Sequence, residues 1–134
     1  MLISTRGRYA LRVMIDLAEH GNDSYVAMRE VAEREQVSLK YLERILPLLV
    51  KEDLIEGVHG KGGGYRLTRD PADYKLGEIL RLTEGDLAPV SCLEQGAEAC
   101  ERKNVCKTLP VWAELNRRIN EYLDSVTLLD LVNN

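Results

Sequence analysis

All three cysteines of the chain lie in one short stretch, SCLEQGAEACERKNVCK, which begins at Ser91. Cys92, Cys100 and Cys106 are separated by seven and then five residues. Thiolates are ligands of zinc and of iron–sulfur clusters, and both kinds of site normally use four ligands. The stretch therefore offers three ligands of a metal site and leaves a fourth to be found elsewhere.

Three interpretations of these cysteines are open from the residues alone. They could be reduced thiols in a mobile loop, with an incidental disulfide. They could bind zinc, although zinc sites favour shorter spacings such as two intervening residues. An iron–sulfur cluster suits wide spacing on a loop, because the chain must wrap around a cluster rather than around one ion.

The composition is that of one compact domain, or of a small domain with an appendage. The 134 residues are 45% hydrophobic and 30% charged, which is sufficient for a core. No apolar run approaches the roughly 20 residues that span a bilayer. The N-terminal stretch MLISTRGRYALRVMIDLAEH mixes charged with apolar residues, unlike a secretory signal. We therefore expect a cytoplasmic protein without membrane contact, whose thiols are kept reduced.

The net charge of −4 argues weakly against a nucleic-acid partner. Its distribution weakens that objection, since residues 1–70 hold 11 basic and 11 acidic residues. Local basic patches on a neutral domain are compatible with phosphate contact. Two acid-free basic segments contain Arg6, Arg8 and Arg12, and Lys61, Arg66 and Arg69.

The first half of the chain has the layout of a winged helix–turn–helix. Apolar periodicity predicts a helix over 6–20 that ends at Gly21, followed by a short helix over 29–37. Ser38 is a good N-cap for a third helix, which Pro47 should bend or shorten. The segment LIEGVHGKGGGYRLTR predicts a β-hairpin with strands at 54–58 and 65–67.

The second half predicts a helix at LGEILRLT, then the cysteine loop, then a long amphipathic helix with Pro110 in its first turn. Thr127 and Asp130 form a capping-box pattern in the final TLLDLVNN. A long amphipathic helix beside a small domain usually needs a partner surface, which predicts a homodimer. The fold class is mainly α with a small β-hairpin. We expect a DNA-binding domain at 1–83, a cluster-binding loop at 84–109, and a dimerisation helix with a C-terminal turn at 110–134.

The start of the third helix carries side chains that suit a DNA groove. Hydroxyl and cationic groups suit phosphates, Arg44 suits a guanine edge, and Glu43 can accept a hydrogen bond from cytosine N4. The alternative is an ordinary solvated helix face. With Arg6 of the N-terminal basic segment, the candidates are Ser38, Lys40, Tyr41, Glu43 and Arg44.

The glycine run GKGGGY lies at the tip of the predicted hairpin. A nucleotide-binding loop would need Gly-Lys-Ser/Thr at the start of a helix, whereas Tyr65 and a strand follow here. A tip that requires positive φ explains the glycines. His59 and Lys61 beside it could contact phosphates or enter the minor groove. His20 and His59 are isolated, and the chain offers no pair of catalytic base and nucleophile, so we do not expect an enzyme.

Taken in order, these segments resemble the IscR-like family of bacterial iron–sulfur cluster transcription regulators, a winged helix–turn–helix family that includes NsrR. The resemblance covers essentially the whole chain. It is carried by GRYAL, MIDLAEH, SLKYLERIL, GKGGGYRL, LGEIL, the three-cysteine loop, Trp112 and TLLDLVNN.

The resemblance implies a homodimer whose long helix crosses its partner and which binds a palindromic operator in double-stranded DNA. It implies a [2Fe–2S] cluster on Cys92, Cys100 and Cys106, and control of iron–sulfur cluster assembly genes. The alternative within this fold is a thiol- or zinc-based redox sensor, or a nitric-oxide sensor, that acts as a repressor. Residues implied to read the groove are Ser38, Tyr41, Glu43 and Arg44, with His59 and Lys61 on the wing. An acid at the position of Glu43 helps such proteins to make DNA choice depend on the cluster.

Two departures leave the fourth cluster ligand unassigned. Leu109 stands where IscR proteins often have a histidine, and Arg8 stands where NsrR-like proteins take an oxygen ligand from the partner. The spacing between the first two cysteines is also longer than in the usual IscR loop. Candidates within reach are an external thiol or Glu94, Glu98, Glu101 and Thr108.

Overall fold

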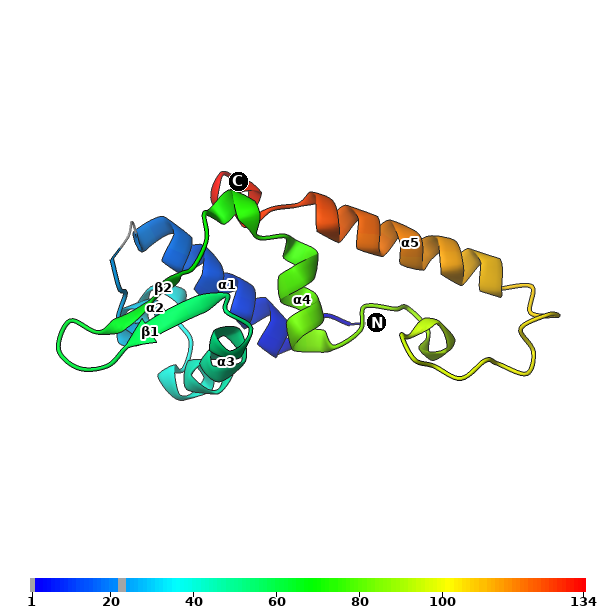
Figure 1. Cartoon of the computed structure of the whole chain (residues 1–134), viewed down its shortest axis with the longest axis horizontal. Helices are drawn as coiled ribbons and strands as arrows, with labels where there is room; N and C mark the ends of the chain where they lie inside the picture. The colour runs from blue at the N-terminus through cyan, green and yellow to red at the C-terminus, as the bar shows by residue number, and fades with distance from the viewer. Residues whose placement is uncertain (1, 22–23) are drawn as a thin grey trace.

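The computed structural model describes residues 2–21 and 24–134. Within these residues it contains α-helices, two short 3-10 helices and one two-stranded antiparallel sheet (Figure 1). This agrees with the predicted fold class. The elements in chain order are α1 (Thr5–His20), α2 (Met28–Glu35), α3 (Leu39–Lys51), β1 (Ile55–Val58), β2 (Gly64–Leu67), η1 (Pro71–Asp73), α4 (Leu76–Glu84), η2 (Ser91–Leu93), α5 (Leu109–Ser125) and α6 (Leu128–Val132).

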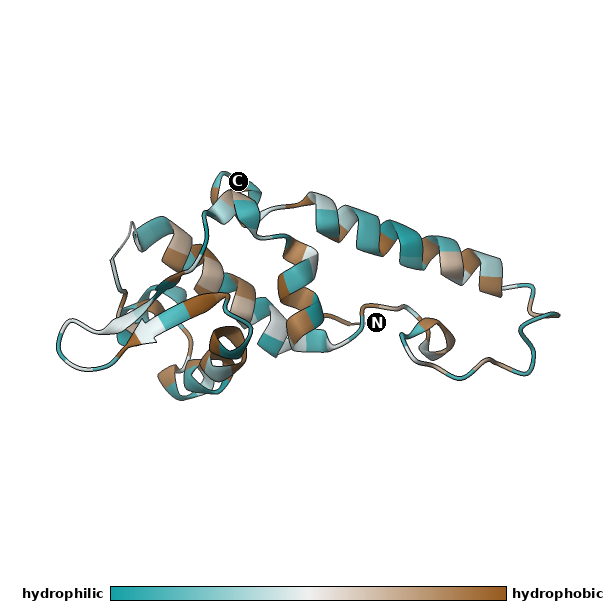
Figure 2. Cartoon of the chain, viewed as in Figure 1, coloured by the Kyte–Doolittle hydropathy of each residue, from teal (hydrophilic) through white to brown (hydrophobic). Residues whose placement is uncertain are grey.

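The core lies around α1, whose apolar stripe is buried against α2, α3, α4 and α6. Hydrophobic residues recur along α1, α3 and α4 (Figure 2), as expected for amphipathic helices packed around one core. Gly21 ends α1 as predicted, since its backbone N–H bonds to the carbonyl of Leu17. Fully buried side chains of this core include Val13, Met14, Leu17, Leu42, Ile45, Leu49, Leu54, Ile55, Tyr74, Ile79 and Leu128.

The helix–turn–helix pair consists of α2 and α3. Gln36 turns the chain between them in the left-handed conformation, with φ 55°. Ser38 caps α3 as predicted, because its hydroxyl accepts a hydrogen bond from the backbone N–H of Tyr41 at 3.3 Å. The pair is fixed to α1 by the buried carboxylate of Asp16, which accepts bonds of 2.9 and 2.7 Å from Arg34 on α2.

Pro47 does not shorten α3, which continues to Lys51. Of the two effects predicted for Pro47, a bend or a shorter helix, the structure does not show the helix ending at the proline. The helix persists because residues on both sides of Pro47, including Leu46 and Leu49, are buried in the core. Pro47 itself is exposed, so its ring lies on the solvent face of the helix.

The β-hairpin forms the wing, with the register Ile55↔Leu67 to Val58↔Gly64. Its tip turns at Gly60 and Gly62, whose φ values of 94° and 78° explain why glycine occurs there. The root of the wing is held by the buried hydroxyl of Tyr74. This hydroxyl donates to the Leu54 carbonyl at 2.6 Å and accepts from the Thr68 backbone N–H at 2.9 Å.

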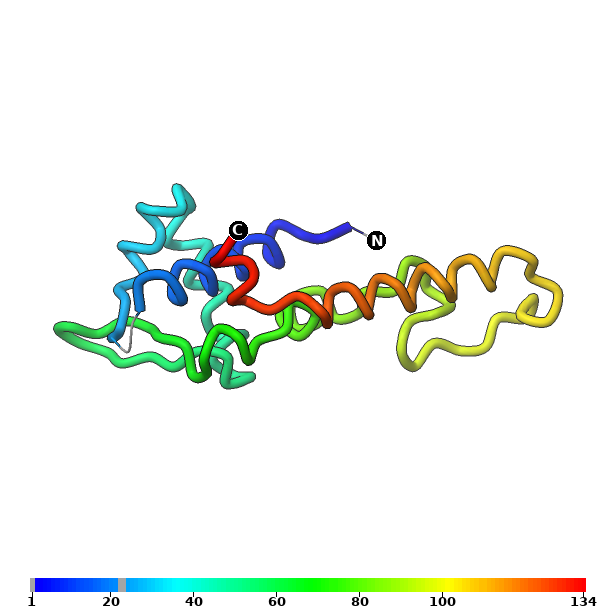
Figure 3. Tube along the Cα trace, turned by 90° about the horizontal axis from the view of Figure 1, so that it is seen from above, coloured from blue at the N-terminus to red at the C-terminus, as the bar shows by residue number. Residues whose placement is uncertain are grey.

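The cysteine loop and the wing lie at opposite ends of the molecule. Figures 1 and 3 show α5 running along the long axis away from the winged helix–turn–helix, with the loop between α4 and α5 at its far end. The chain then returns to the core through α6, where Leu128 is buried and the predicted capping box of Thr127 and Asp130 is present. No helix in the described part of the chain is both long and apolar enough to cross a membrane.

Candidate metal centre and nucleic-acid interface

The three cysteines line one cavity of about 290 Å³ in the loop between α4 and α5. All three are free thiols; Cys92 and Cys100 are exposed and Cys106 is half-buried. The structure therefore places the three predicted ligands on the wall of one cavity, and their role as metal ligands stays a prediction. The other residues on the cavity wall are Leu93, Ala97, Glu98, Ala99, Lys103 and Leu109.

Cys92 is positioned by a turn that Asp86 closes. One oxygen of the Asp86 carboxylate accepts from the Ala88 backbone N–H at 2.8 Å, and the other accepts from the Gln95 N–H at 2.7 Å. Both bonds lower the pKa of Asp86 below its ordinary value, and the bond from Gln95 has the larger effect. The clamp spans η2, which carries Cys92, and the neighbouring Leu87 is buried.

Cys106 lies just before the first turn of α5. Its Sγ is 3.3 Å from the hydroxyl oxygen of Thr108. That hydroxyl, together with the backbone N–H groups of Thr108 and Leu109, lowers the pKa of the Cys106 thiol. Because the thiolate is the form that binds metals, the start of α5 favours ligation at this position.

The cysteines share a cavity but are not gathered around a single point. Zinc holds all its ligand atoms about 2.0 to 2.3 Å from one point. In the described part of the chain, no three His, Cys, Asp or Glu side chains are gathered to hold one ion in this way. The three cysteines nevertheless lie on the wall of one shared cavity, and thiolates are the ligand type that both zinc sites and iron–sulfur clusters use.

The fourth-ligand candidates take different positions. Glu98 lies on the cavity wall, and Leu109 lies there as well but has no donor atom. The Thr108 hydroxyl is paired with Cys106. Arg8 lies on α1, where it donates to the Thr5 hydroxyl at 3.1 Å. The remaining two candidates, Glu94 and Glu101, are exposed in the loop and are not among the wall residues.

The start of α3 presents a polar, exposed surface. Ser38, Lys40, Glu43 and Arg44 are all exposed, with the Ser38 hydroxyl engaged in the helix cap. Tyr41 is half-buried, and its ring meets the edge of Tyr9 with 5.3 Å between centroids. Tyr41 thus packs α3 against α1, while the side chains of Lys40, Glu43 and Arg44 are exposed and can meet a groove.

On the wing, His59 and Lys61 are exposed near the glycine tip. They are therefore accessible for contact with phosphates or with the minor groove. Along β2, Arg66 lies over the Tyr25 ring at 4.5 Å and bonds to Glu56 at 2.6 Å. These contacts stiffen the wing below its tip.

Arg6 and Arg12 of the N-terminal basic segment make contacts within the protein. A guanidinium nitrogen of Arg6 donates to the Thr83 carbonyl near the C-terminal end of α4. Arg12 pairs with the Glu35 carboxylate at 3.1 Å at the end of α2. Arg6 is nevertheless exposed, and its role in DNA binding stays a prediction.

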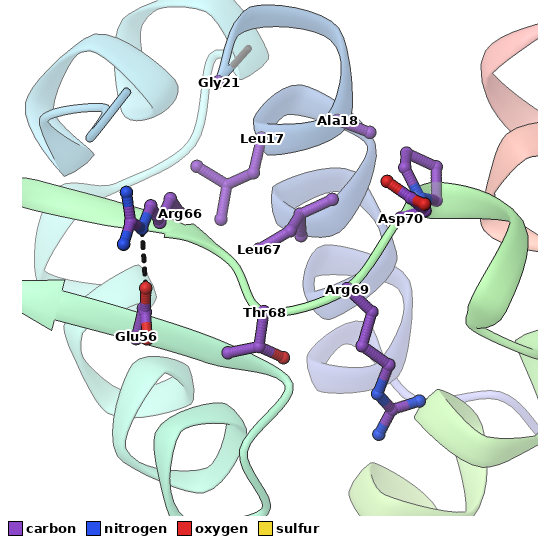
Figure 4. Close-up of a pocket in the computed structure, with 10 residues that line it drawn as sticks. Leu17, Ala18, Gly21, Glu56, Arg66, Leu67, Thr68, Arg69 and Asp70 are labelled. Carbon is purple, nitrogen blue, oxygen red and sulfur yellow. Dashed lines mark hydrogen bonds and ion pairs between the residues drawn. The ribbon is translucent and has the colours of Figure 1, made fainter. Parts of the chain in front are cut away.

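A second cavity of about 510 Å³ lies between α1 and the root of the wing (Figure 4). Three of its charged side chains are in ion pairs, Glu56 with Arg66 at 2.6 Å and Arg69 with Glu78 at 2.8 Å. None of the site residues predicted from the sequence is among the residues that line it. We assign it no part in the site.

The sequence did not reveal how α5 is attached to the winged domain. Arg81 on α4 bonds to Asp124 and, at 2.7 Å, to Asn120, both on α5. Gly77 allows this approach, because a Cβ there would collide with the Asp124 carboxylate. A glycine inside a helix was the one sequence signal for such close packing.

Comparison with known proteins gives one consistent result. The sequence model of the Rrf2 family, described as iron-dependent transcriptional regulator, matches residues 3–134. The HTH-type transcriptional regulator IscR of Yersinia pseudotuberculosis serotype O:1b is 37% identical over 134 residues, which is 100% of this chain and 80% of the relative.

Two solved structures are also similar to this chain. The structure of CymR, titled the global cysteine regulator of B. subtilis, has a TM-score of 0.85 and 32% identity and covers 99% of this chain and 97% of its own. T. potens IscR has a TM-score of 0.77 and 34% identity, with 99% and 87% covered. The IscR relative and the family are named as transcriptional regulators, a non-enzymatic class, in agreement with the expectation that this chain is not an enzyme.

Proposed function

The chain belongs to the Rrf2 family of transcriptional regulators, and we propose that it senses iron–sulfur cluster status through a cluster held by Cys92, Cys100 and Cys106. It acts in the cytoplasm as a homodimer on a palindromic operator and controls iron–sulfur cluster assembly genes. The observation that carries this proposal is that all three cysteines lie on the wall of one cavity.

The loop residues prepare the donors. Asp86 holds the turn that carries Cys92, and Thr108 favours the thiolate of Cys106. When bound, a [2Fe–2S] cluster supplies a redox-sensitive group whose presence depends on the supply of iron and sulfide. The protein's part is to hold that group where its gain or loss reorganises the loop.

The exposed face of α5 supports the homodimer. No residue of α5 is buried in the single chain. Val111, Leu115 and Tyr122 are 59%, 40% and 66% exposed, and their spacing places them on one stripe. A second copy packed along this stripe would bury it. The twofold axis between the two copies would then relate their DNA-binding surfaces at the start of α3, as a palindrome requires.

Helix α5 connects the cavity of the cysteines with the part of the molecule that carries the proposed DNA-binding surface at the start of α3. Cys106 precedes its N-terminal end, and Asp124 near its C-terminal end is tied to Arg81 on α4. α4 packs on α1, which packs on the helix–turn–helix pair. A change in the loop therefore alters how α5 lies on α4. In the dimer this changes the separation of the two DNA-binding surfaces at the start of α3.

The test is anaerobic reconstitution with iron and sulfide, followed by visible absorption and metal analysis. We expect a coloured protein whose absorption is lost in Cys92→Ala and retained in the matched control Ser91→Ala. Operator binding by the loaded and empty forms should differ. A wild-type protein that stays colourless and takes up no iron would contradict the cluster proposal.

A thiol-based sensor is the second candidate, favoured by the similarity to CymR and by the exposure of Cys92 and Cys100. In that case the protein would carry no iron, and peroxide would change its mass reversibly and weaken operator binding. Iron content and intact mass measured on the same sample distinguish the two candidates. Zinc content measured in parallel tests the zinc version of this candidate.

A further inference from the structure

We infer that the Glu98 carboxylate is the fourth ligand of the cluster, with the Lys103 ammonium as the compensating charge beside it. This inference rests on the proposed function, since it names the ligand that completes the same site. It comes from the wall of the cavity that the three cysteines share.

Elimination along the wall leaves one additional donor. Four of the six other lining residues are apolar: Leu93, Ala97, Ala99 and Leu109. Of the remaining two, the Lys103 ammonium has no lone pair to donate to a metal. Glu98 is thus the one side chain besides the cysteines, on the described wall, that can bind iron, and carboxylate oxygen is an established iron ligand in proteins.

The course of the backbone is suited to this role. Gly96 turns the chain with φ 81°, a left-handed conformation that glycine accepts readily. Residues 97–100 then follow the wall, with alanines on either side of Glu98. Their small side chains leave the volume of the cavity to the carboxylate and to what it binds.

Lys103 can offset part of the negative charge of the proposed ligand set. Three thiolates and a carboxylate bring four negative charges to the ligand set. Lys103 is the one cationic side chain on the described wall, and its backbone N–H bonds to the Cys100 carbonyl at 3.0 Å. A cation on this wall would offset part of the negative charge of the loaded site.

An oxygen ligand predicts a particular behaviour. Iron–sulfur clusters are held mainly by soft thiolates, so a carboxylate marks the iron that exchanges its ligand most easily. Loss of the cluster should therefore begin at Glu98 rather than at a cysteine. This makes the residue a determinant of how readily the protein reports a falling supply.

The test compares wild type with Glu98→Ala, Glu98→Gln and Glu98→Cys, and with Glu94→Ala and Glu101→Ala as matched loop controls. All are reconstituted anaerobically with ⁵⁷Fe. Mössbauer spectra report whether one iron has an oxygen ligand, and decay of visible absorption in the presence of a chelator gives the rate of cluster loss. Circular dichroism confirms that each variant is folded.

We expect Glu98→Ala and Glu98→Gln to lose the cluster about ten times faster or more, the scale on which changes at a metal site act. Glu98→Cys should give an all-sulfur spectrum and slower loss, whereas both controls should match wild type. Leu109→His in the Glu98→Ala background should slow the loss again, because position 109 lies on the same wall.

The inference is overturned if wild type binds the cluster and both Glu98→Ala and Glu98→Gln keep its spectrum and its rate of loss. A faster loss confined to Glu94→Ala or Glu101→Ala would move the ligand to that residue and also overturn it. Failure of the wild type to take up any cluster is a different result, since it refutes the proposed function itself.

Discussion

Arg81 on α4 and Asp124 on α5 form a two-point ion pair, with Nη1–Oδ1 at 2.8 Å and Nη2–Oδ2 at 3.0 Å. A second bond from Arg81 to Asn120 extends the contact by one helical turn. These bonds fix the C-terminal half of a helix that has no buried residue of its own. The pair is therefore the main polar attachment between the proposed dimer helix and the domain that reads DNA.

Removing this attachment should uncouple the two functions without unfolding the protein. We expect Arg81→Gln to lower the free energy of unfolding by about 1 kcal/mol or less, because both partners are more than a third exposed. The difference in operator affinity between loaded and empty protein should shrink. Fluorescence anisotropy on both forms measures it. Arg118→Gln, which breaks only a pair within α5, should leave the difference intact.

The same pair predicts a dependence of stability on pH. The Arg81 guanidinium holds the pKa of Asp124 below its ordinary value. A carboxyl whose pKa is lower in the folded than in the unfolded state stabilises above the unfolded pKa, and this contribution is lost as pH falls through the folded pKa.

Urea unfolding from pH 6 down to pH 3 should therefore show a falling free energy that flattens in Asp124→Asn. Arg81→Gln should flatten it to the same extent, and the double variant should add little. A double variant whose slope changes by the sum of the two single effects would mean that they act separately.

The pair of Asp16 and Arg34 should matter far more for stability. The Asp16 side chain is fully buried and accepts two bonds from Arg34, which joins α1 to α2. Asp16→Asn removes the buried charged partner of the guanidinium and should cost about 2 to 3 kcal/mol. Thermal and urea unfolding measure this. Glu30→Gln, which removes an exposed carboxylate 4.0 Å from the same arginine, should change stability by less than about 0.5 kcal/mol.

The exposed start of α3 should carry the salt-dependent part of DNA binding. Lys40→Ala with Arg44→Ala removes two cations, so the slope of log affinity against log salt should fall by about 2. Lys51→Ala, at the other end of α3, should leave that slope near the wild-type value. If the double variant binds the operator as tightly as wild type at moderate salt, α3 does not read DNA through its N-terminal end.

Local signals in the sequence predicted the elements well. Ser38, Gly21 and the pair of Thr127 and Asp130 act on backbone groups within a few residues, so their effect is readable without the fold. The three cysteines lie on one loop and line one cavity there, and the cluster site predicted from their spacing stays a prediction.

Contacts between distant elements escaped the sequence. Arg81 and Asp124 are unremarkable charges until α5 lies along α4, and the burial of Asp16 depends on how α2 crosses α1. The helix does not end at Pro47, one of the two effects expected there, because the core holds α3 on both sides of the proline. The sequence alone did not distinguish Glu98 from the other acidic residues of the loop. The structure places Glu98, but not those neighbours, on the cavity wall.

Because α6 returns to the core, the elements in the second half of the chain form a closed path of contacts with α1. The path leads from α1 to α4, through the loop to α5, and back to α1 through α6. The loop between α4 and α5 is the long part of this path without regular helix, so we expect it to be the part that moves. Within α5, Asp124 lies 15 residues from Leu109, the first residue of the helix, about 22 Å at 1.5 Å per residue. If α5 pivots at the Arg81–Asp124 pair, each ångström of movement at Leu109 turns the helix by about 2.5°, and in the proposed dimer the two helices would turn relative to each other by twice that angle.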